Sequence, residues 1–500
     1  MDLVFKPSRT GEAPIFRQLA DHLEALVATD RLPAGAKLPA TRELAASLKL
    51  GRNTVARAYE RLIADGLLSA HVGQGTFVAG RAVSTIASAE SNARARAFAW
   101  PGLFARRAQA FTVPAALLAD LEGARFDFRG GQVDLDSLPR EDLAWAFSRA
   151  FARAAKVREL AAHNDPYGWP PLREEVARHL ASRGIVCTAD DIAIVGGAQQ
   201  AIDLAARVLV DPGDTVVMEQ PGYFGAALAF ASCEATLVGI GVDDQGLRTS
   251  ELARLLEARR AKLLYVTPAT QSPTGAMMSE ERRREVLKLA DAWQMPVFED
   301  DYDAELRYAG PPVAALKTQD EAGQIIYSGT FSKTVFPSLR LGYVVAPQPL
   351  LAKMVTARWR ADFGTGVVAQ EALATLLRTR GLSRHLKRIR AVHAARLEVM
   401  LSTLAEVMPD GVTWNEPRGG HAVWLTLPLN ADTRAIEEAA RERGIAYTRG
   451  EVFYFDGRGH NSMHLAFTRM KEDDIANGVA ELGKIVRANL RVSATKTAGT

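Results

Sequence analysis

The sequence predicts a multidomain protein in which a small α+β module precedes a much larger α/β domain. Its 500 residues are too many for one compact domain. Residues 1–80 follow helical apolar periods and end in a hairpin pattern, whereas from residue 123 onward short apolar runs alternate with helical stretches. The segment 81–122 between them is rich in Ala, Ser and Arg, has no apolar period, and is predicted to be a linker.

The N-terminal module is predicted to be a winged helix-turn-helix. Apolar positions indicate one helix over 14–27, a second that begins near Thr41, and a third after the turn at Gly51. Residues 67–78 then indicate a hairpin around a turn at Gly73. Three helices followed by a hairpin form the winged helix-turn-helix layout; from periodicity alone, a dimerisation or ligand-binding module is the alternative.

Several polar residues of this module stand where a winged helix contacts DNA. Arg52, Asn53 and Thr54 begin the third helix, where their side chains can reach base edges or phosphates. Arg42 begins the preceding helix and suits a phosphate contact, and Gly73 lets the wing approach DNA closely. The module holds 10 basic and 8 acidic residues, so its net charge alone does not indicate DNA.

Composition and charge exclude several classes of protein. Hydrophobic residues make up 48% and charged residues 24%, which excludes a disordered chain, a collagen and a coiled-coil rod. The net charge of +3 means that any DNA-binding surface is local. Cys187 and Cys233 are too few for a disulfide framework or a cysteine-built zinc site, and no metal is predicted. Neither a signal peptide nor an apolar run of membrane-spanning length is present, so we expect a cytoplasmic protein.

Six short apolar runs in the large domain predict the strands of a parallel sheet covered by helices. Ligands of such sheets bind beyond the carboxyl ends of the strands, so the residues that follow the runs are the candidate site. The runs are Ile192–Val195, Thr215–Met218, Lys262–Val266, Pro296–Phe298, Ile325–Tyr327 and Leu341–Val345.

Two of these strand ends carry groups that suit opposite charges. Gly197, Ala198 and Gln199 open a helix, and the free backbone amides of such a turn suit an anion such as phosphate. Asp300 lies in an acidic run that ends an apolar strand, where a carboxylate could stabilise a protonated ring nitrogen. A solvated loop or a metal site is the alternative for the acidic run, although no histidine lies in it.

A third strand end carries a lysine among hydroxyl groups. Lys333 follows Thr330 and Ser332, and Arg340 comes seven residues later. A lysine in these surroundings suits a Schiff base beside a phosphate, although a lone lysine is more often a surface charge. The three strand ends in this order indicate pyridoxal 5′-phosphate as the cofactor.

Two long, ordered sets of motifs resemble known families. Residues 14–78 include Arg52-Asn53-Thr54-Val55 and Gly73-Gln74-Gly75-Thr76-Phe77-Val78, and this stretch resembles the GntR-type winged helix. Residues 123–490 include Glu299-Asp300-Asp301-Tyr302-Asp303 and Gly329-Thr330-Phe331-Ser332-Lys333-Thr334, and they resemble a fold-type I aminotransferase. Together they resemble a MocR/GabR-family transcriptional regulator.

The resemblance implies an arrangement of domains and partners. The large α/β domain would extend to about residue 350, a smaller C-terminal α/β lobe would follow to 490, and residues 491–500 would form a flexible tail. Family members are typically head-to-tail homodimers that bind promoter DNA and a small-molecule effector.

The resemblance also implies roles for the site residues. Lys333 would form the Schiff base with pyridoxal phosphate, and Asp300 would pair with the pyridine nitrogen, or Asp301 if the register is shifted by one residue. Tyr302 would reach the ring hydroxyl and Tyr223 would stack on the ring. The phosphate would be held by Thr330, Ser332, Arg340 and the backbone of Gly197, Ala198 and Gln199.

Departures from the family pattern bear on which ligand is recognised. His163 replaces a tyrosine that binds phosphate from the partner subunit; a core or interface histidine is an equal alternative. His464 and Gly225 stand where aminotransferases or γ-aminobutyrate-sensing relatives place arginines that bind a carboxylate. Arg449 and Arg469 could substitute, although surface positions are the simpler interpretation of both.

These observations favour a regulator that senses an amine, an amino compound or pyridoxal phosphate itself by chemistry at Lys333, without efficient transamination. The alternatives are an active aminotransferase with a fused DNA-binding domain, and a DNA-binding repressor whose large domain only dimerises and holds no cofactor.

Overall fold

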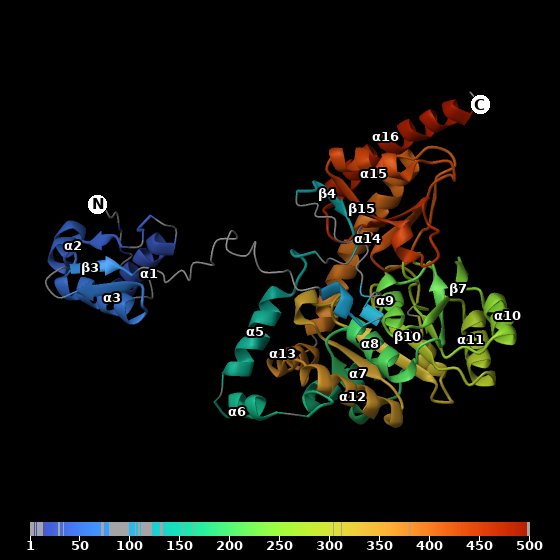
Figure 1. The fold of residues 1–500 in the computed structure, drawn as a ribbon, viewed down its shortest axis with the longest axis horizontal. Coiled ribbons are helices and arrows are strands. Elements are labelled where there is room, and N and C mark those ends of the chain that lie inside the picture. Colours follow the sequence, from blue (N-terminus) through green and yellow to red (C-terminus); the bar gives the residue numbers. More distant parts are fainter. Residues whose placement is uncertain are drawn as a thin grey trace. The chain divides into compact units, whose positions relative to one another are not determined.

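The computed structural model divides the chain into two compact units, Met1–Leu103 and Phe104–Thr500 (Figure 1). None of the helices in the described part of the chain has the length and apolar character of a membrane span. The structure describes residues 5, 7, 14–28, 31–33, 35–71, 75–79, 100–105, 107, 108, 111, 123–130, 134–152, 154–163, 165–303, 305–311, 313–379 and 381–497.

The first unit has the three helices and the hairpin that the sequence predicts. Buried leucines and valines of the helices, among them Leu19, Leu44 and Val55, share one apolar core with Val78 of the hairpin. A short strand that the sequence did not predict joins the hairpin, giving an antiparallel sheet in the order β1-β3-β2. The predicted wing residue Gly73 lies outside the described residues. The elements are α1 (Ile15–Ala28), β1 (Lys37–Leu38), α2 (Thr41–Leu48), α3 (Arg52–Ala64), β2 (Leu68–His71) and β3 (Gly75–Val78).

The second unit is built around an eight-stranded sheet in the order β5-β12-β11-β10-β9-β6-β7-β8. All six predicted strands belong to it. The prediction of a parallel sheet is wrong for β12, which runs antiparallel to both β5 and β11. The chain returns from β11 to β12 without a crossover helix, so the two strands pair in opposite directions. The strands are β5 (Ile192–Val195), β6 (Thr215–Gln220), β7 (Thr236–Asp243), β8 (Gly246–Leu247), β9 (Leu263–Val266), β10 (Val297–Asp301), β11 (Ile325–Thr330) and β12 (Gly342–Val345).

Helices cover both faces of this sheet, as the apolar strands require. Alternate residues of one strand reach different cores: Ile192 and Ile194 join the core with α7, α11 and α13, and Ala193 and Val195 join the core with α8, α9 and α12. The helices of this larger lobe are α5 (Arg140–Phe151), α6 (Ala154–Ala162), α7 (Pro170–Ala181), α8 (Ala198–Leu209), α9 (Phe224–Ser232), α10 (Thr249–Ala258), α11 (Glu280–Ala292), α12 (Gln348–Asp362) and α13 (Val367–Arg378).

The smaller lobe has a five-stranded sheet in the order β13-β14-β16-β15-β4. It is not built from C-terminal residues alone, because β4 (Phe126–Phe128) pairs in parallel with β15 (Ile445–Arg449), and Phe126 and Phe128 are buried in this lobe's core. The other elements are β13 (Thr413–Trp414), β14 (Ala422–Thr426), β16 (Ser462–Ala466), α15 (Thr433–Glu442) and α16 (Glu472–Thr497), which continues into the segment predicted as a flexible tail.

A single long helix belongs to both lobes. In α14 (Gly381–Val407), Leu382 and Leu386 are buried in a core of the larger lobe, whereas Met400 and Leu404 are buried in the core of the smaller lobe. Figure 1 shows this helix between the large sheet and the region of α15 and α16. The short 3-10 helices are η2 (Trp100–Leu103), η4 (Ala189–Asp191), η5 (Leu316–Gln319), η6 (Pro337–Leu339) and η7 (Gly450–Phe453).

Candidate cofactor and ligand site

A cavity of about 290 Å³ opens where β10 and β11 end, and residues of both lobes line it. Of the residues that the sequence assigned to cofactor binding, all but His163 line this one cavity. Their individual roles remain predictions. The lining residues are Gly130, Gly197, Ala198, Gln199, Tyr223, Phe224, Ser272, Asp300, Tyr302, Thr330, Ser332, Lys333, Pro337, Arg340, His421, Thr448, Phe453 and His464.

One end of the cavity is suited to a dianion. Gly197 caps the N-terminus of α8 with a φ of 103°, a conformation that favours glycine. A Cβ atom at this position would lie 3.3 Å from Arg340 Nη2, so the absence of a side chain lets the guanidinium approach the helix N-terminus. The hydroxyls of Thr330 and Ser332, 3.1 Å apart, line the same cavity. Helix amides, hydroxyls and a guanidinium together fit a phosphate group.

Asp300 presents a buried carboxylate oxygen that lacks a partner. Its side chain is 4% exposed, and Tyr265 donates a hydrogen bond to Oδ2 at 2.7 Å. Oδ1 is buried and accepts no hydrogen bond from the described residues. Burial, with the nearby Asp301 and Asp303, raises the pKa of Asp300 to about 7. An unpartnered carboxylate oxygen in a cavity fits a protonated ring nitrogen, which would supply the missing positive partner.

Asp301, the alternative in the sequence, points away from the cavity. Successive residues of a strand face opposite sides of the sheet. Arg183 donates to Asp301 Oδ2 at 2.6 Å and Tyr327 donates to the same oxygen at 2.5 Å. This carboxylate is therefore held by its own cation and hydroxyl, and Asp300 is the acid that faces the cavity.

Lys333 lies three residues beyond the end of β11 and is half-buried in the cavity wall. Burial lowers the pKa of its amine, and the charge of Asp303 opposes this shift only in part. A lysine with a lowered pKa is more often present as the neutral amine, which is the nucleophilic form. The amine is therefore suited to attack an aldehyde.

Tyr223 is fixed by a chain of hydrogen bonds. Its hydroxyl donates to Gln199 Oε1 at 3.0 Å, and Gln199 Nε2 donates to the carbonyl of Gly225 at 2.8 Å. Burial raises the pKa of Tyr223 to about 12, so the phenol stays protonated. A Cβ atom at Gly225 would lie 2.4 Å from Gln199 Oε1 and 2.5 Å from Tyr223 Cζ. A side chain at this position would therefore displace Gln199 and Tyr223 from the positions that they occupy here.

Two histidines of the smaller lobe form part of the cavity wall. The ring of His464 on β16 lies 5.5 Å from the ring of His421, which directly precedes β14. His421 Nδ1 is 3.3 Å from Asp303 Oδ2, and Tyr302 meets the His421 ring edge-on at 5.8 Å. Sequence reasoning missed His421; the only signal was a histidine after Gly419-Gly420, directly before a strand.

Both histidines of this wall are neutral. Burial and the charge of Lys333 lower the pKa of His421 to about 3. Burial and the neighbouring His421 hold the pKa of His464 well below its ordinary value. The wall therefore offers hydrogen bonds without a positive charge.

The two arginines that could have replaced the missing carboxylate partner are engaged elsewhere. Arg469 pairs with Asp127 at 2.5 Å, and Arg449 pairs with Glu437 at 3.2 Å. Neither lines the cavity, and among the described lining residues the only lysine and arginine are Lys333 and Arg340.

His163 lies outside the cavity of its own chain. Its ring meets the Trp169 ring edge-on at a centroid distance of 4.8 Å. Its Nε2 atom is buried without a partner among the described residues, and burial lowers the pKa of the imidazole.

The predicted DNA-contacting residues lie at the start of two helices of the first unit. Arg42 is the second residue of α2 and is exposed. Arg52 and Asn53 open α3 and are exposed, whereas Thr54 is half-buried. The first turn of α3 contains no acidic residue. This turn therefore presents a cation, an amide and free backbone N–H groups to the solvent.

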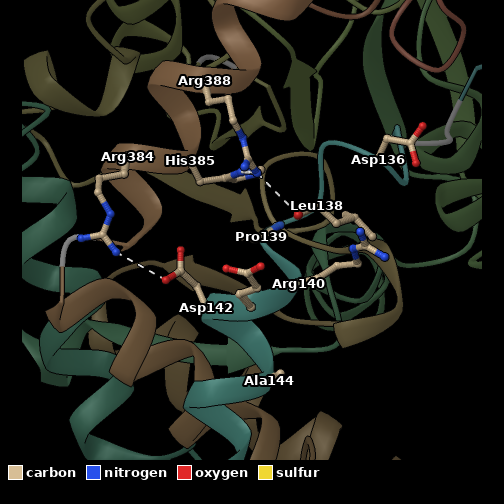
Figure 2. A pocket seen from close by; sticks show the side chains of 10 residues that line it. Asp136, Leu138, Pro139, Arg140, Asp142, Ala144, Arg384, His385 and Arg388 are labelled. Atoms are coloured by element: carbon tan, nitrogen blue, oxygen red, sulfur yellow. Dashed lines mark hydrogen bonds and ion pairs between the residues drawn. The ribbon is translucent and has the colours of Figure 1, made fainter.

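A larger hollow of about 630 Å³ lies between the start of α5 and the start of α14 (Figure 2). Two of its arginines are already engaged: Arg384 donates to Asp142 at 3.4 Å, and Arg388 donates to the carbonyl of Ser137 at 2.8 Å. None of the predicted site residues lines it. Within the described part of the chain, no group of three His, Cys, Asp or Glu side chains is placed to hold a metal ion.

Comparison with known families agrees with this two-part arrangement. Residues 16–78 match the bacterial regulatory proteins of the gntR family, and residues 132–482 match aminotransferase class I and II. Over 482 residues the chain is 31% identical to the probable rhizopine catabolism regulatory protein MocR of Rhizobium meliloti, covering 95% of this chain and 94% of that protein. The chain belongs to the MocR-type family of regulators. Its N-terminal unit is the DNA-binding domain of this family.

The large domain of this MocR-type chain is also similar to aminotransferases. It is 36% identical to aromatic-amino-acid aminotransferase 1 of Thermococcus litoralis over 330 residues, 65% of this chain and 79% of that enzyme. The α-aminoadipate aminotransferase LysN of Thermus thermophilus superposes with a TM-score of 0.74 at 30% identity, covering 79% of this chain and all of LysN. That structure holds N-(5′-phosphopyridoxyl)-L-leucine, a derivative of the predicted cofactor.

Proposed function

We propose that this protein is a pyridoxal-phosphate-dependent transcriptional regulator that binds promoter DNA and senses a small primary amine at Lys333. The observation that carries the proposal is the convergence of Asp300, Lys333 and the start of α8 on one cavity, in a chain that begins with a winged helix. A protein of this kind acts on DNA in the cytoplasm.

The cavity residues divide the binding of the cofactor between them. Arg340, the hydroxyls of Thr330 and Ser332 and the α8 amides would hold the phosphate, and Asp300 would hold a proton on the pyridine nitrogen. Tyr302 and Tyr223 would contact the ring. Lys333 would supply the amine that attaches the cofactor. Bound pyridoxal phosphate supplies an aldehyde that condenses reversibly with primary amines.

The absence of a free arginine favours sensing over efficient turnover of amino acids. An α-carboxylate is best bound by two parallel hydrogen bonds from a guanidinium. In the described lining, Arg340 is the only guanidinium, and it stands at the phosphate end. An aminotransferase for common amino acids would need a second one.

We also propose a head-to-tail homodimer in which His163 of each protomer binds the phosphate in the cavity of its partner. The unpartnered Nε2 atom of His163 and its position outside its own cavity support this arrangement. Mixing Lys333→Ala chains with His163→Ala chains tests it. Heterodimers with one intact cavity should bind cofactor more tightly than either parent; equal affinity would contradict a contribution in trans.

An active aminotransferase with a fused DNA-binding domain is the second candidate. It is favoured by the complete set of Asp300, Tyr302 and Lys333 in the cavity and by the similarity to aminotransferases. The deciding experiment incubates the loaded chain with amines and 2-oxo acids, follows visible absorption and amino-acid formation, and measures operator binding in parallel. Amine-dependent changes in absorption and DNA affinity without sustained product support the regulator; many turnovers per site would contradict it.

A further inference from the structure

The histidine wall, formed by His421 and His464, belongs to the part of the cavity lining that the smaller lobe supplies. Gly130 lies against it and donates its backbone N–H towards Thr448 Oγ1 at 3.5 Å. A Cβ atom on Gly130 would lie 3.4 Å from His464 Nδ1 and 3.9 Å from His421 Nε2. The two ring nitrogens therefore converge on the same space beside a residue without a side chain.

His464 Nδ1 is the clearest sign that a ligand belongs in this space. The residue is 4% exposed, and the atom makes no hydrogen bond with the described residues. The Phe453 ring lies 5.2 Å and the His421 ring 5.5 Å from the His464 ring, so two aromatic contacts hold the imidazole in place. A buried polar atom without a partner costs free energy, which a ligand group that hydrogen-bonds to it would recover.

The second nitrogen, His421 Nε2, is oriented by Asp303. Because His421 Nδ1 faces the Asp303 carboxyl group at 3.3 Å, the other ring nitrogen is directed towards the cavity. With the proton on Nδ1 this nitrogen accepts a hydrogen bond, and in the other tautomer it donates one. A hydroxyl group can do both, so it fits either tautomer.

The same space is unfavourable for a carboxylate. A buried carboxylate needs a positive partner, and the imidazoles that form the wall are neutral. Arg449 and Arg469 are paired with acids outside the cavity.

We propose that the ligand of this cavity is a small primary amine with a distal hydroxyl group, which His421 and His464 bind where aminotransferases bind a carboxylate. This inference rests on the proposed function, because the amine is expected to react at the cofactor beside Lys333. The cavity volume of about 290 Å³ must hold cofactor and amine together, so the amine is small.

The test uses the full chain loaded with pyridoxal phosphate and matched probes of three lengths. Ethanolamine, propanolamine and butanolamine are each compared with the amino acid of the same length (glycine, β-alanine and γ-aminobutyrate) and with the plain alkylamine. Affinity is measured from visible absorption. At the length that fits, the amino alcohol should bind about tenfold more tightly than both counterparts, the effect of one or two hydrogen bonds.

Variants of His464 test whether the histidine wall causes the preference for amino alcohols. His464→Leu should erase the advantage over the alkylamine, whereas His464→Asn, which keeps a donor and an acceptor, should retain most of it. His464→Arg should reverse the preference in favour of the amino acid. His460→Asn changes an exposed histidine of the same lobe outside the cavity and should leave all affinities unchanged.

The outcomes separate this inference from the proposed function. If the chain takes up no cofactor, the proposed function fails and this inference fails with it. If the loaded chain binds the amino acids as tightly as the amino alcohols, or if His464→Leu keeps the preference, only this inference is overturned. Should His464→Arg not load, the Leu and Asn variants still decide.

Discussion

The two candidate sites of this protein present their polar groups in opposite ways. On the winged helix, Arg42, Arg52 and Asn53 are exposed at the start of two helices. In the cavity, Asp300 is buried and Lys333 is half-buried. Desolvation raises the pKa of Asp300 and lowers the pKa of Lys333, which favours the neutral form of each. Exposed charges attract a polyanion over a distance and are screened by salt. Buried groups respond instead to a partner that enters the cavity, so one site suits recognition of DNA and the other suits detection of a small molecule.

The largest effect is expected for Lys333→Ala, which should abolish the response of the cavity to amines and leave DNA binding intact. Lys333→Ala removes the only amine in the described lining that can attach a cofactor aldehyde, so the absorption change on adding amines should disappear. Operator affinity without amine should change less than about twofold, since the winged helix belongs to another unit. Visible spectroscopy and a mobility-shift assay measure the two effects. A large loss of DNA affinity in a folded Lys333→Ala chain would show that the sites are coupled even without ligand.

Asp300→Asn tests what the buried carboxylate contributes to cofactor binding and to stability. Cofactor affinity should fall about 10- to 100-fold, because a hydrogen bond to a charged group is lost. In the chain without cofactor, burial raises the pKa of Asp300 to about 7, so the folded state holds the proton more tightly than the unfolded state. The free energy of unfolding therefore decreases as the pH rises towards 7. An asparagine does not ionise and avoids this decrease. Without cofactor, the melting temperature of the variant should therefore exceed that of the native chain at about pH 8, and by a smaller margin at about pH 5. Thermal melts at both pH values check the sign, and an equal shift at both would contradict a buried ionised carboxylate.

Arg52→Ala tests whether the third helix reads bases. If Arg52 contacts a guanine edge, affinity for the operator should fall by about 1–3 kcal/mol while affinity for random DNA changes little. Competition binding with both DNAs measures the difference. Equal losses on both would instead make Arg52 a phosphate contact.

Arg42→Ala should have the smallest effect. A phosphate contact from the start of α2 lowers affinity for all sequences alike and reduces the slope of log affinity against log salt by about 1. Titrations at several salt concentrations measure this slope. A selective loss on the operator would move Arg42 to the base-reading set.

Local patterns in the sequence were sufficient to predict most of the large sheet and most of the site. Ile192–Val195 was predicted at its observed bounds because buried strands are continuous apolar runs. The short strand β4 was missed because its partner, β15, lies more than 300 residues away in the sequence. β7 was missed because Gly239 and Gly241 interrupt its apolar pattern.

The histidine wall is the part of the site that the sequence predicted least well. His464 was identified only by comparison with a family pattern, and His421 was not identified at all. The two residues are 43 positions apart and meet only because β14 and β16 pair, with Trp424 opposite His464. Such a juxtaposition depends on strand register, which composition does not specify.

The helix α14 connects the two lobes whose residues line the cavity. It has 27 residues and is therefore about 40 Å long, with one end embedded in each lobe. Lys333 and Asp300 belong to the lobe at its first turns, and His421 and His464 to the lobe at its last turns. A tilt of about 5° at the first turn displaces the last turn by about 3 Å. Such a tilt would move the turns against which the C-terminal helix α16 packs.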